Sequence, residues 1–124
     1  MTLLAYHPNE WLASSIIASS ININPVLVRK ELKALKNYGL IESKEGKNGG
    51  IKLMKPAKDI YISDVFLSAK GSEHVLSLSS NLPNAACKIG EQINDKLLSM
   101  FVDIDDAIVN RLKNQTLEAF KNQF

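Results

Sequence analysis

The feature that most constrains the fold is a long helical periodicity in "KIGEQINDKLLSMFVDIDDAIVNRLKNQ", which begins at Lys88. Its apolar residues recur at steps of three and four, as on one face of an α-helix: Ile89, Ile93, Leu97, Met100, Ile104, Ile108 and Leu112. Leu98, Phe101 and Val102 widen this stripe beyond what one neighbouring helix needs. Such a helix either folds back on its own domain or pairs with a second copy, and the width of the stripe favours pairing. We therefore predict a homodimer with these interface residues: Ile93, Leu97, Met100, Phe101, Ile104 and Ile108.

A second helix is predicted by "NPVLVRKELKALKNYG". Asn24 is a good N-terminal cap, Pro25 suits the first helical position, and Gly39 suits a left-handed C-terminal cap. One face is an apolar stripe of Val28, Leu32 and Leu35. The opposite face is basic, with Glu31 as the only nearby acid, and carries Arg29, Lys30, Lys33, Lys36 and Asn37.

The segments on either side of this helix indicate a winged helix-turn-helix. Upstream, "ASSIIASSIN" predicts a short helix capped by the hydroxyl of Ser14, and "SININ" forms a tight connection. Helical pairs of this kind also occur in purely structural settings. Downstream, the strand-like runs "LIESK" and "IKLM" flank "EGKNGG", whose glycines permit a β-hairpin. The predicted tip of this wing carries Lys44, Lys47 and Asn48, Lys52 lies on the return strand, and Pro56 ends the pairing.

Charge is unevenly distributed along the chain. Residues 24–58 hold nine Lys and Arg against three acids, a local charge of +6, whereas the rest of the chain carries −4. A basic segment in an otherwise acidic chain indicates a polyanionic partner at one face. The alternative is a solvated, lysine-rich surface.

The remaining segments are less informative. "ISDVFLSAKG" predicts a short helix capped by Ser63, with Asp64 in its first turn and Gly71 as its end. Its core-facing residues would be Val65, Phe66 and Ala69. Residues 72–87 read as a connection, and "TLEAFKNQF" as a final short helix or a frayed tail.

Several functional classes are disfavoured. No apolar run is long enough to span a bilayer, and the N-terminal residues do not resemble a signal peptide, so we expect a cytoplasmic protein. There is no phosphate-binding glycine loop, nucleophile elbow or Ser/His/Asp set, so we expect no enzyme. His7 and His74 have no companions at metal-ligand spacing, and we expect no metal site. Trp11 is interpreted as a packing anchor, and the cluster of Asp103, Asp105 and Asp106 as a solvated helix face.

The segment from Asn24 to Gly71 resembles the winged-helix core of the Rrf2 family of bacterial transcription regulators, relatives of the iron–sulfur regulators IscR and NsrR. The shared features are a helix ending in "YGLI", paired wing glycines, a Leu-x-x-Pro exit, and an Ile-x-x-x-Asp-Val helix ending in glycine. The branch typified by YwnA is more similar, because "AYHPNEWLASSIIASSININPVLVRK" and "NLPNAACKIGEQI" also have counterparts there. The resemblance covers nearly the whole chain.

This resemblance implies a mostly α fold with a small β-hairpin wing and a long C-terminal dimerisation helix. The implied parts are a DNA-binding domain over residues 1–71, a linker over 72–87, and the dimerisation helix with its tail over 88–124. It implies a homodimer that binds double-stranded operator DNA, acting as a repressor. The implied DNA contacts are Ser14, Ser15, Asn24, Pro25, Val26, Arg29, Lys30, Lys33, Lys44, Lys47, Asn48, Gly49 and Gly50.

The chain departs from the family pattern in three ways. Cluster-binding members carry three cysteines between the wing and the long helix, whereas this chain has only Cys87, so we expect no iron–sulfur cluster and no other cofactor. Only "MTLLAYH" precedes the first turn, where the family has a longer helix. Ile16 stands where the branch tends to have a polar residue.

Two residues have alternative roles. Arg29 could donate two hydrogen bonds to a guanine edge, or it could contact a phosphate. Cys87 is a candidate sensor of oxidants or electrophiles, because a helix N-terminus and the adjacent Lys88 favour the thiolate, but it could equally be an inert core residue. A competing function for the whole chain is a winged-helix module that binds an acidic protein rather than DNA.

Overall fold

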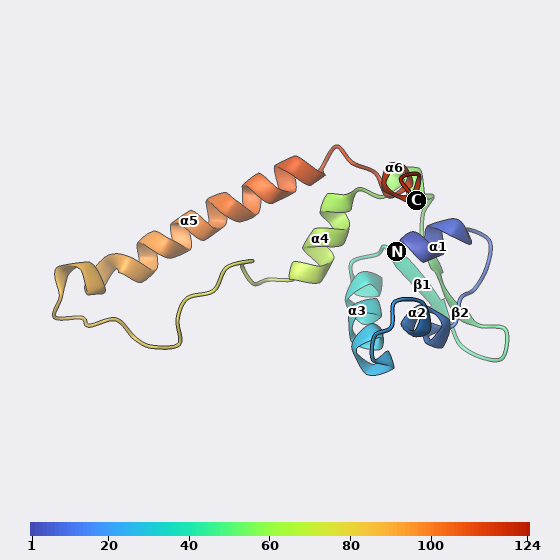
Figure 1. Ribbon diagram of the computed structural model, residues 1–124, viewed down its shortest axis with the longest axis horizontal. Helices are drawn as coiled ribbons and strands as arrows, with labels where there is room; N and C mark the ends of the chain where they lie inside the picture. The colour runs from blue at the N-terminus through green and yellow to red at the C-terminus, as the bar shows by residue number, and fades with distance from the viewer.

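The computed structural model describes residues 1–124, which form a winged part (residues 1–71 and 113–124) and one long helical arm (residues 88–112) (Figure 1). The elements in chain order are α1 (Thr2–Tyr6), α2 (Ser14–Ser20), α3 (Pro25–Asn37), β1 (Ile41–Lys44), β2 (Gly50–Leu53), the 3-10 helix η1 (Ala57–Asp59), α4 (Ile62–Lys70), α5 (Lys88–Leu112) and α6 (Leu117–Lys121). The two strands form an antiparallel hairpin that pairs Ile41 with Leu53 and Lys44 with Gly50. The predicted mostly helical fold with a hairpin wing is confirmed.

Helix α3 has the ends that its sequence predicts. The Asn24 side chain accepts a hydrogen bond from the Val26 N–H at 2.8 Å, and Pro25 opens the helix. At the other end Gly39 has φ +80°, and the Leu40 N–H donates to the Leu35 carbonyl at 3.0 Å. This is a Schellman-type ending, and it turns the chain directly into β1.

The predicted cap of α2 is wrong. The helix begins at Ser14 itself, Ala13 occupies the cap position, and no side chain bonds to the free amides there. The hydroxyl of Ser14 is therefore not used to stabilise the helix end.

The predicted cap of α4 is also wrong. The helix begins at Ile62, before Ser63, and the Asp64 carboxylate accepts from the Tyr61 N–H at 3.4 Å. Ala69 is exposed, whereas Ser63 and Ser68 are the buried residues of α4. Small side chains on the buried face let α4 approach both α3 and α5, which it contacts.

The hydrophobic core belongs to the winged part. Its members come from α1, α2, α3, the hairpin, α6 and the residues that adjoin these elements, and none comes from α5: Leu4, Ala5, Leu12, Ile17, Ala18, Val28, Leu40, Ile41, Ile51, Leu53, Ile60 and Leu117. Burying these side chains is the main stabilisation available to the fold.

The C-terminal segment returns to this core. Leu117 is 1% exposed, and its N–H donates to the Ile60 carbonyl at 2.8 Å. The Ile62 N–H donates to the Gln115 carbonyl at 2.8 Å. Helix α6 also lies beside α1 (Figure 1). The "TLEAFKNQF" segment is therefore a docked helix, and its contacts are with the winged part rather than with the rest of 88–124.

Helix α5 and the connection before it extend away from the winged part (Figure 1). Only Phe101 and Asp105 are buried along its whole length. No helix of the chain is both long and apolar enough to cross a membrane. The arm therefore leaves most of its apolar stripe without a cover in the single chain.

Candidate nucleic-acid interface

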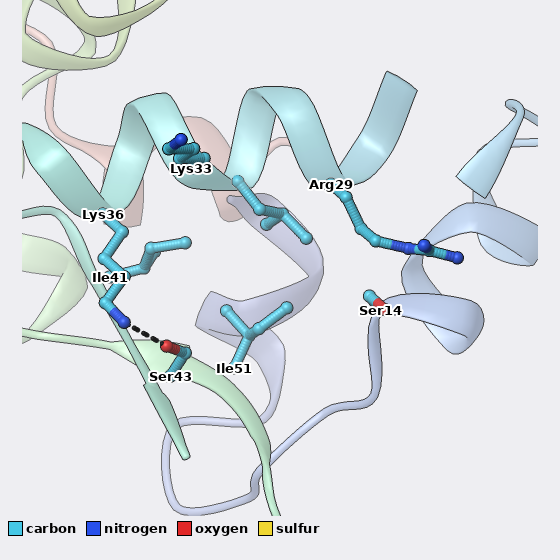
Figure 2. Close-up of a pocket in the computed structure, with 8 residues that line it drawn as sticks. Ser14, Arg29, Lys33, Lys36, Ile41, Ser43 and Ile51 are labelled. Atoms are coloured by element: carbon cyan, nitrogen blue, oxygen red, sulfur yellow. Dashed lines mark hydrogen bonds between the residues drawn. The ribbon is translucent and has the colours of Figure 1, made fainter. Parts of the chain in front are cut away.

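A basic pocket lies between helix α3 and the wing, with the start of α2 at its rim (Figure 2). It encloses about 260 Å³. Its floor is apolar, its walls carry three cations and two hydroxyls, and no acidic side chain lines it: Ser14, Arg29, Leu32, Lys33, Lys36, Ile41, Ser43 and Ile51. An open concavity of this composition attracts anions.

The cations come from one face of α3. Arg29, Lys33 and Lys36 follow one another at steps of four and three, so their side chains share a stripe along the helix. The Lys36 ammonium donates to the Ser43 hydroxyl of β1 at 2.6 Å, and this contact joins the helix to the wing (Figure 2). Arg29 extends toward the end of the pocket where Ser14 lies.

The sequence predicts part of this pocket and misses the rest. Ser14, Arg29 and Lys33 are predicted contacts, and the structure brings them together. Lys36 and Ser43 are not predicted contacts, but they line the pocket too. Lys36 could have been found from its spacing, because it lies two helical turns after Arg29, whereas Ser43 joins the pocket only through the folding of the hairpin.

The other predicted contacts at the helix-turn-helix are on the outer surface. Ser15, Pro25 and Lys30 are exposed, and Val26 is 66% exposed although it is apolar. The Asn24 side-chain oxygen is engaged in capping α3.

The wing tip combines exposed polar side chains with two glycines that the backbone geometry of the hairpin requires. Lys47 and Asn48 are exposed in the loop between the strands. A Cβ atom on Gly49 would collide with the carbonyl oxygen of Lys44. Gly50 has φ +151°, and a Cβ there would lie 2.7 Å from the carbonyl oxygen of Leu12. Both glycines are thus required for the hairpin to close and dock, independently of any ligand.

Trp11 packs against the loop end of the hairpin. The ammonium groups of Lys44 and Lys52 lie 5.9 and 5.8 Å from the centre of its ring. Next to it, Leu12 and Ile51 exchange backbone hydrogen bonds of 3.0 and 2.8 Å. Cation–π contacts of this kind orient the two lysines. Trp11 therefore has a second role beyond the predicted packing.

Cys87 stands at the N-terminus of α5, at the end of the arm that lies away from the winged part (Figure 1). It is exposed, which excludes the inert core interpretation within the single chain. No side chain caps this helix, but the free N–H groups of Gly90 and Ile89 face the sulfur and lower the pKa of the Cys87 thiol. The Cys87 N–H donates to the Asn84 carbonyl at 3.0 Å, and a Cβ on Gly90 would collide with that same carbonyl.

The predicted dimer residues on α5 differ in their surroundings. Phe101 is 8% exposed and is already covered within the chain, whereas Met100 is 50% exposed. The remaining four are half-buried: Ile93, Leu97, Ile104 and Ile108.

The interpretation of Asp105 as part of a solvated face is wrong. Asp105 is 7% exposed, and its carboxylate lies 2.7 Å from His74 Nδ1 and 3.4 Å from the Lys70 ammonium. Burial by itself would raise the pKa of Asp105, but hydrogen bonds from His74, Val75 and Lys70 outweigh it and lower that pKa. His74, expected to be an ordinary polar residue, is a member of this cluster.

No group of three or more His, Cys, Asp or Glu side chains in the chain is arranged to hold a metal ion. The only thiol is Cys87, and the first turn of α5 adds a single carboxylate, Glu91, so three ligands do not come together there. The residues present in one chain therefore do not fit an iron–sulfur cluster or another iron site.

Comparisons with known proteins agree with this geometry. The sequence model of the Rrf2 family, described as iron-dependent transcriptional regulators, matches residues 1–123. The HTH-type transcriptional regulator YwnA of Bacillus subtilis is 32% identical over 92% of this chain and 84% of its own length.

Two solved structures show the same fold. A crystal structure of a protein from Lactobacillus plantarum, described as a transcriptional regulator, covers 97% of this chain and 81% of its own, with 24% identity and a TM-score of 0.77. CymR of Bacillus subtilis, described as a global cysteine regulator, covers 99% of this chain and 90% of its own, with 19% identity and a TM-score of 0.66.

The family match spans almost the whole chain, and the solved structures share its fold. This chain is a member of the Rrf2 family of DNA-binding, helix-turn-helix transcriptional regulators.

Proposed function

We propose that this chain binds operator DNA as a homodimer and acts as a repressor. In this proposal α3 enters the major groove and the hairpin lies over the adjacent backbone, as in other winged helices. The observation that supports it most directly is the acid-free basic pocket between these two elements. A dimer bound at a promoter would repress transcription by occupying the DNA that the polymerase needs.

The pocket is proposed to hold a backbone phosphate. With α3 in the major groove and the wing beside the neighbouring groove, the DNA backbone that separates these two grooves must run between α3 and the wing. The pocket lies at that position. Lys36 and Arg29 would neutralise the phosphate, and the hydroxyls of Ser14 and Ser43 would donate to its oxygens. This assigns Arg29 to a phosphate rather than to guanine.

Base recognition is then left to the exposed outer side of the helix start. Val26 and Lys30 lie there, next to the tight turn that leads into α3. Val26 would contact a thymine methyl group, and Lys30 a purine edge or a second phosphate. Phosphate contacts fix the register, so that these few side chains can read sequence.

The uncovered stripe of α5 supports the homodimer. Ile89 is 71% exposed and Met100 is 50% exposed, and the two lie on the same side of the helix, three turns apart. A second copy of the same helix would remove this apolar surface from water. Two-fold symmetry would then place the two recognition helices in successive major-groove turns on one face of the duplex.

The test is a salt titration of binding to duplex DNA, using wild type, Lys36→Gln and the control Lys58→Gln. Lys58 is exposed and lies outside the pocket, so both variants lose one charge. Each lost phosphate contact should reduce the slope of log affinity against log salt by about 0.9. We expect that reduction for each bound winged unit in Lys36→Gln and a much smaller one in Lys58→Gln.

The outcomes separate the alternatives. If wild type fails to bind any duplex at low salt, DNA binding is wrong and the protein-binding module is favoured. If wild type binds and Lys36→Gln keeps the full slope, only the phosphate pocket is wrong. Selection of bound sequences from random duplexes, followed by a reporter assay with the selected site, then tests repression: loss of the regulator should raise expression.

A response to oxidants or electrophiles through Cys87 is the regulatory part of this proposal. The exposure of the thiol and its lowered pKa support it, because the thiolate is the nucleophile that adds to a quinone. We expect a quinone to change operator affinity in wild type and to leave Cys87→Ser unaffected, with equal affinities before treatment. An equal response of both proteins would rule out Cys87 as the sensor.

A further inference from the structure

The only buried carboxylate of the chain lies where the arm meets the winged part. Asp105 belongs to α5, Lys70 is the last residue of α4, and His74 and Val75 follow in the connection. The Val75 N–H donates to Asp105 Oδ1 at 3.1 Å, while His74 Nδ1 lies 2.7 Å from Oδ2. One carboxylate thus joins three successive parts of the chain, across 30 or more residues of sequence.

Apolar contact supports the same point. Phe101 lies one turn before Asp105 on α5, and the two are the buried residues of that helix. The His74 ring meets the Phe101 ring edge-on, with centres 6.4 Å apart. The side chain of Lys70 is 14% exposed, so its charge is also largely removed from water. The fully buried residues at the junction of the arm and the winged part therefore lie within one helical turn of α5.

A buried carboxylate is a poor residue for a contact whose only role is to hold two elements together. Removing a charge from water has a free-energy cost that its partners must offset, and apolar residues of similar size often stabilise a buried site better. What hydrogen bonds and ion pairs add is direction, because they are satisfied at only one orientation of the helix. The hydrogen-bond geometry of Asp105 therefore suits a residue that sets the orientation of α5 relative to the winged part.

We infer that Asp105 is a positioning residue that fixes the orientation of α5 relative to the winged part. The inference has a second consequence that rests on the proposed dimer: the orientation of α5 then sets the separation of the two recognition helices. That separation selects the spacing between operator half-sites. Asp105 would thus contribute to specificity without touching DNA.

The test measures the orientation directly, by pulsed electron paramagnetic resonance between two spin labels on one chain. Labels are attached to Asn37→Cys on α3 and Gln92→Cys on the far half of α5, in a Cys87→Ser background; all three positions are exposed. Labelled protein is diluted with an excess of unlabelled protein, so that only distances within one chain are observed. The measurement therefore does not depend on dimerisation.

We expect a narrow distance distribution in this parent and a broad one in Asp105→Asn. Loss of a charge-assisted hydrogen bond should raise the population of displaced orientations about tenfold. Asp103→Asn and Asp106→Asn are matched controls, because both carboxylates are exposed on the same helix and both changes remove one charge. Their distributions should match that of the parent.

Two further variants separate positioning from general stability. His74→Phe keeps a ring against Phe101 but loses the nitrogen that meets Asp105, and Lys70→Met keeps the aliphatic stem without the charge. Each should broaden the distribution, and neither should broaden it further when combined with Asp105→Asn, because residues of one network are not additive. A melting temperature that falls while the distribution stays narrow would show a merely structural role and overturn the inference.

A single label at Asn37→Cys, without dilution, reports the distance between two chains. Absence of any coupling in this sample would refute the proposed dimer, while the measurement within one chain would still decide the role of Asp105. If the dimer forms, Asp105→Asn should also lose the preference of wild type for one half-site spacing among duplexes that carry the selected site at several spacings. Retention of that preference, with a narrow distribution, would overturn the inference.

Discussion

The winged part and the α5 arm are stabilised in different ways. Every member of the hydrophobic core cluster comes from the winged part, which also recruits α6 from the far end of the chain. The arm has the longest helix and an extended apolar stripe, yet only Phe101 and Asp105 are buried on it. A helix can therefore be strongly specified by its sequence and still lack a tertiary partner within its own chain.

The two regions also present different chemistry. The winged part has a basic pocket between α3 and the hairpin, whereas the arm has an apolar surface that no other element of the chain covers. The first suits a charged ligand and the second suits another copy of the same helix. The following predictions test whether this division is real.

The largest expected effect lies in the core of the winged part. Leu40 is 1% exposed, so Leu40→Ala should lower the free energy of unfolding by about 2–5 kcal/mol, because it leaves a cavity. Ile89 is 71% exposed on the arm, and Ile89→Ala should change the unfolding of dilute protein by less than about 0.5 kcal/mol. Chemical denaturation of both variants is the measurement. Equal losses would contradict the division.

The next effect concerns association. Met100→Glu places a charge in the proposed interface of α5, and should weaken self-association roughly 10- to 100-fold, since the charge would have to be desolvated. Because Met100 is 50% exposed in the single chain, the winged part should keep its fold. Sedimentation across a concentration series and circular dichroism measure the two properties. An unchanged dimer would show that α5 does not form the interface.

A smaller effect is expected at the start of the recognition helix. Asn24→Ala removes the only side-chain cap of α3 and should lower the free energy of unfolding by about 1 kcal/mol. Association through the arm should not change. Asn24→Ser, which keeps a capping oxygen, is the control and should recover most of the loss. Thermal unfolding and sedimentation of the two variants check this separation.

The smallest effect is a pH dependence at the junction of the two regions. The pKa of Asp105 is lowered in the fold, so its contribution to stability is present above the unfolded pKa of about 3.9 and is lost as pH falls through the lower, folded pKa. The difference in melting temperature between wild type and Asp105→Asn should therefore be largest near neutral pH. It should shrink as the pH falls below about 4. A difference independent of pH would show that the charge does not matter.

Much of the fold follows from short-range patterns. The Asn-Pro start and the Gly39 end of α3, the glycine turn of the wing, and the long period of α5 all depend on residues within a few positions of one another. These were predicted correctly. The caps of α2 and α4 were not, because Ser14 and Ser63 are reasonable caps locally but lie inside the helices that packing extends by one or two residues.

The candidate site was only partly predictable. Arg29 and Lys33 are visible as a basic helix face, and Lys36 could have been added from the same spacing. Ser43 enters the pocket because the hairpin folds β1 against α3, and the Trp11 platform forms because β2 pairs with the segment that precedes α2. Neither contact has a signature in the local sequence.

The sequence by itself determined helices α2, α3, α4 and α5, where the wing turns, and that basic residues gather in one segment, because each of these properties depends on neighbouring residues. Only the tertiary structure decided that α6 completes the core, that Lys36 and Ser43 meet across the pocket, and that Asp105 is buried rather than solvated. The physical reason is distance along the chain: the Asp105 carboxylate is stabilised by His74, 31 positions away, and only the packing of α5 against α4 brings the two together.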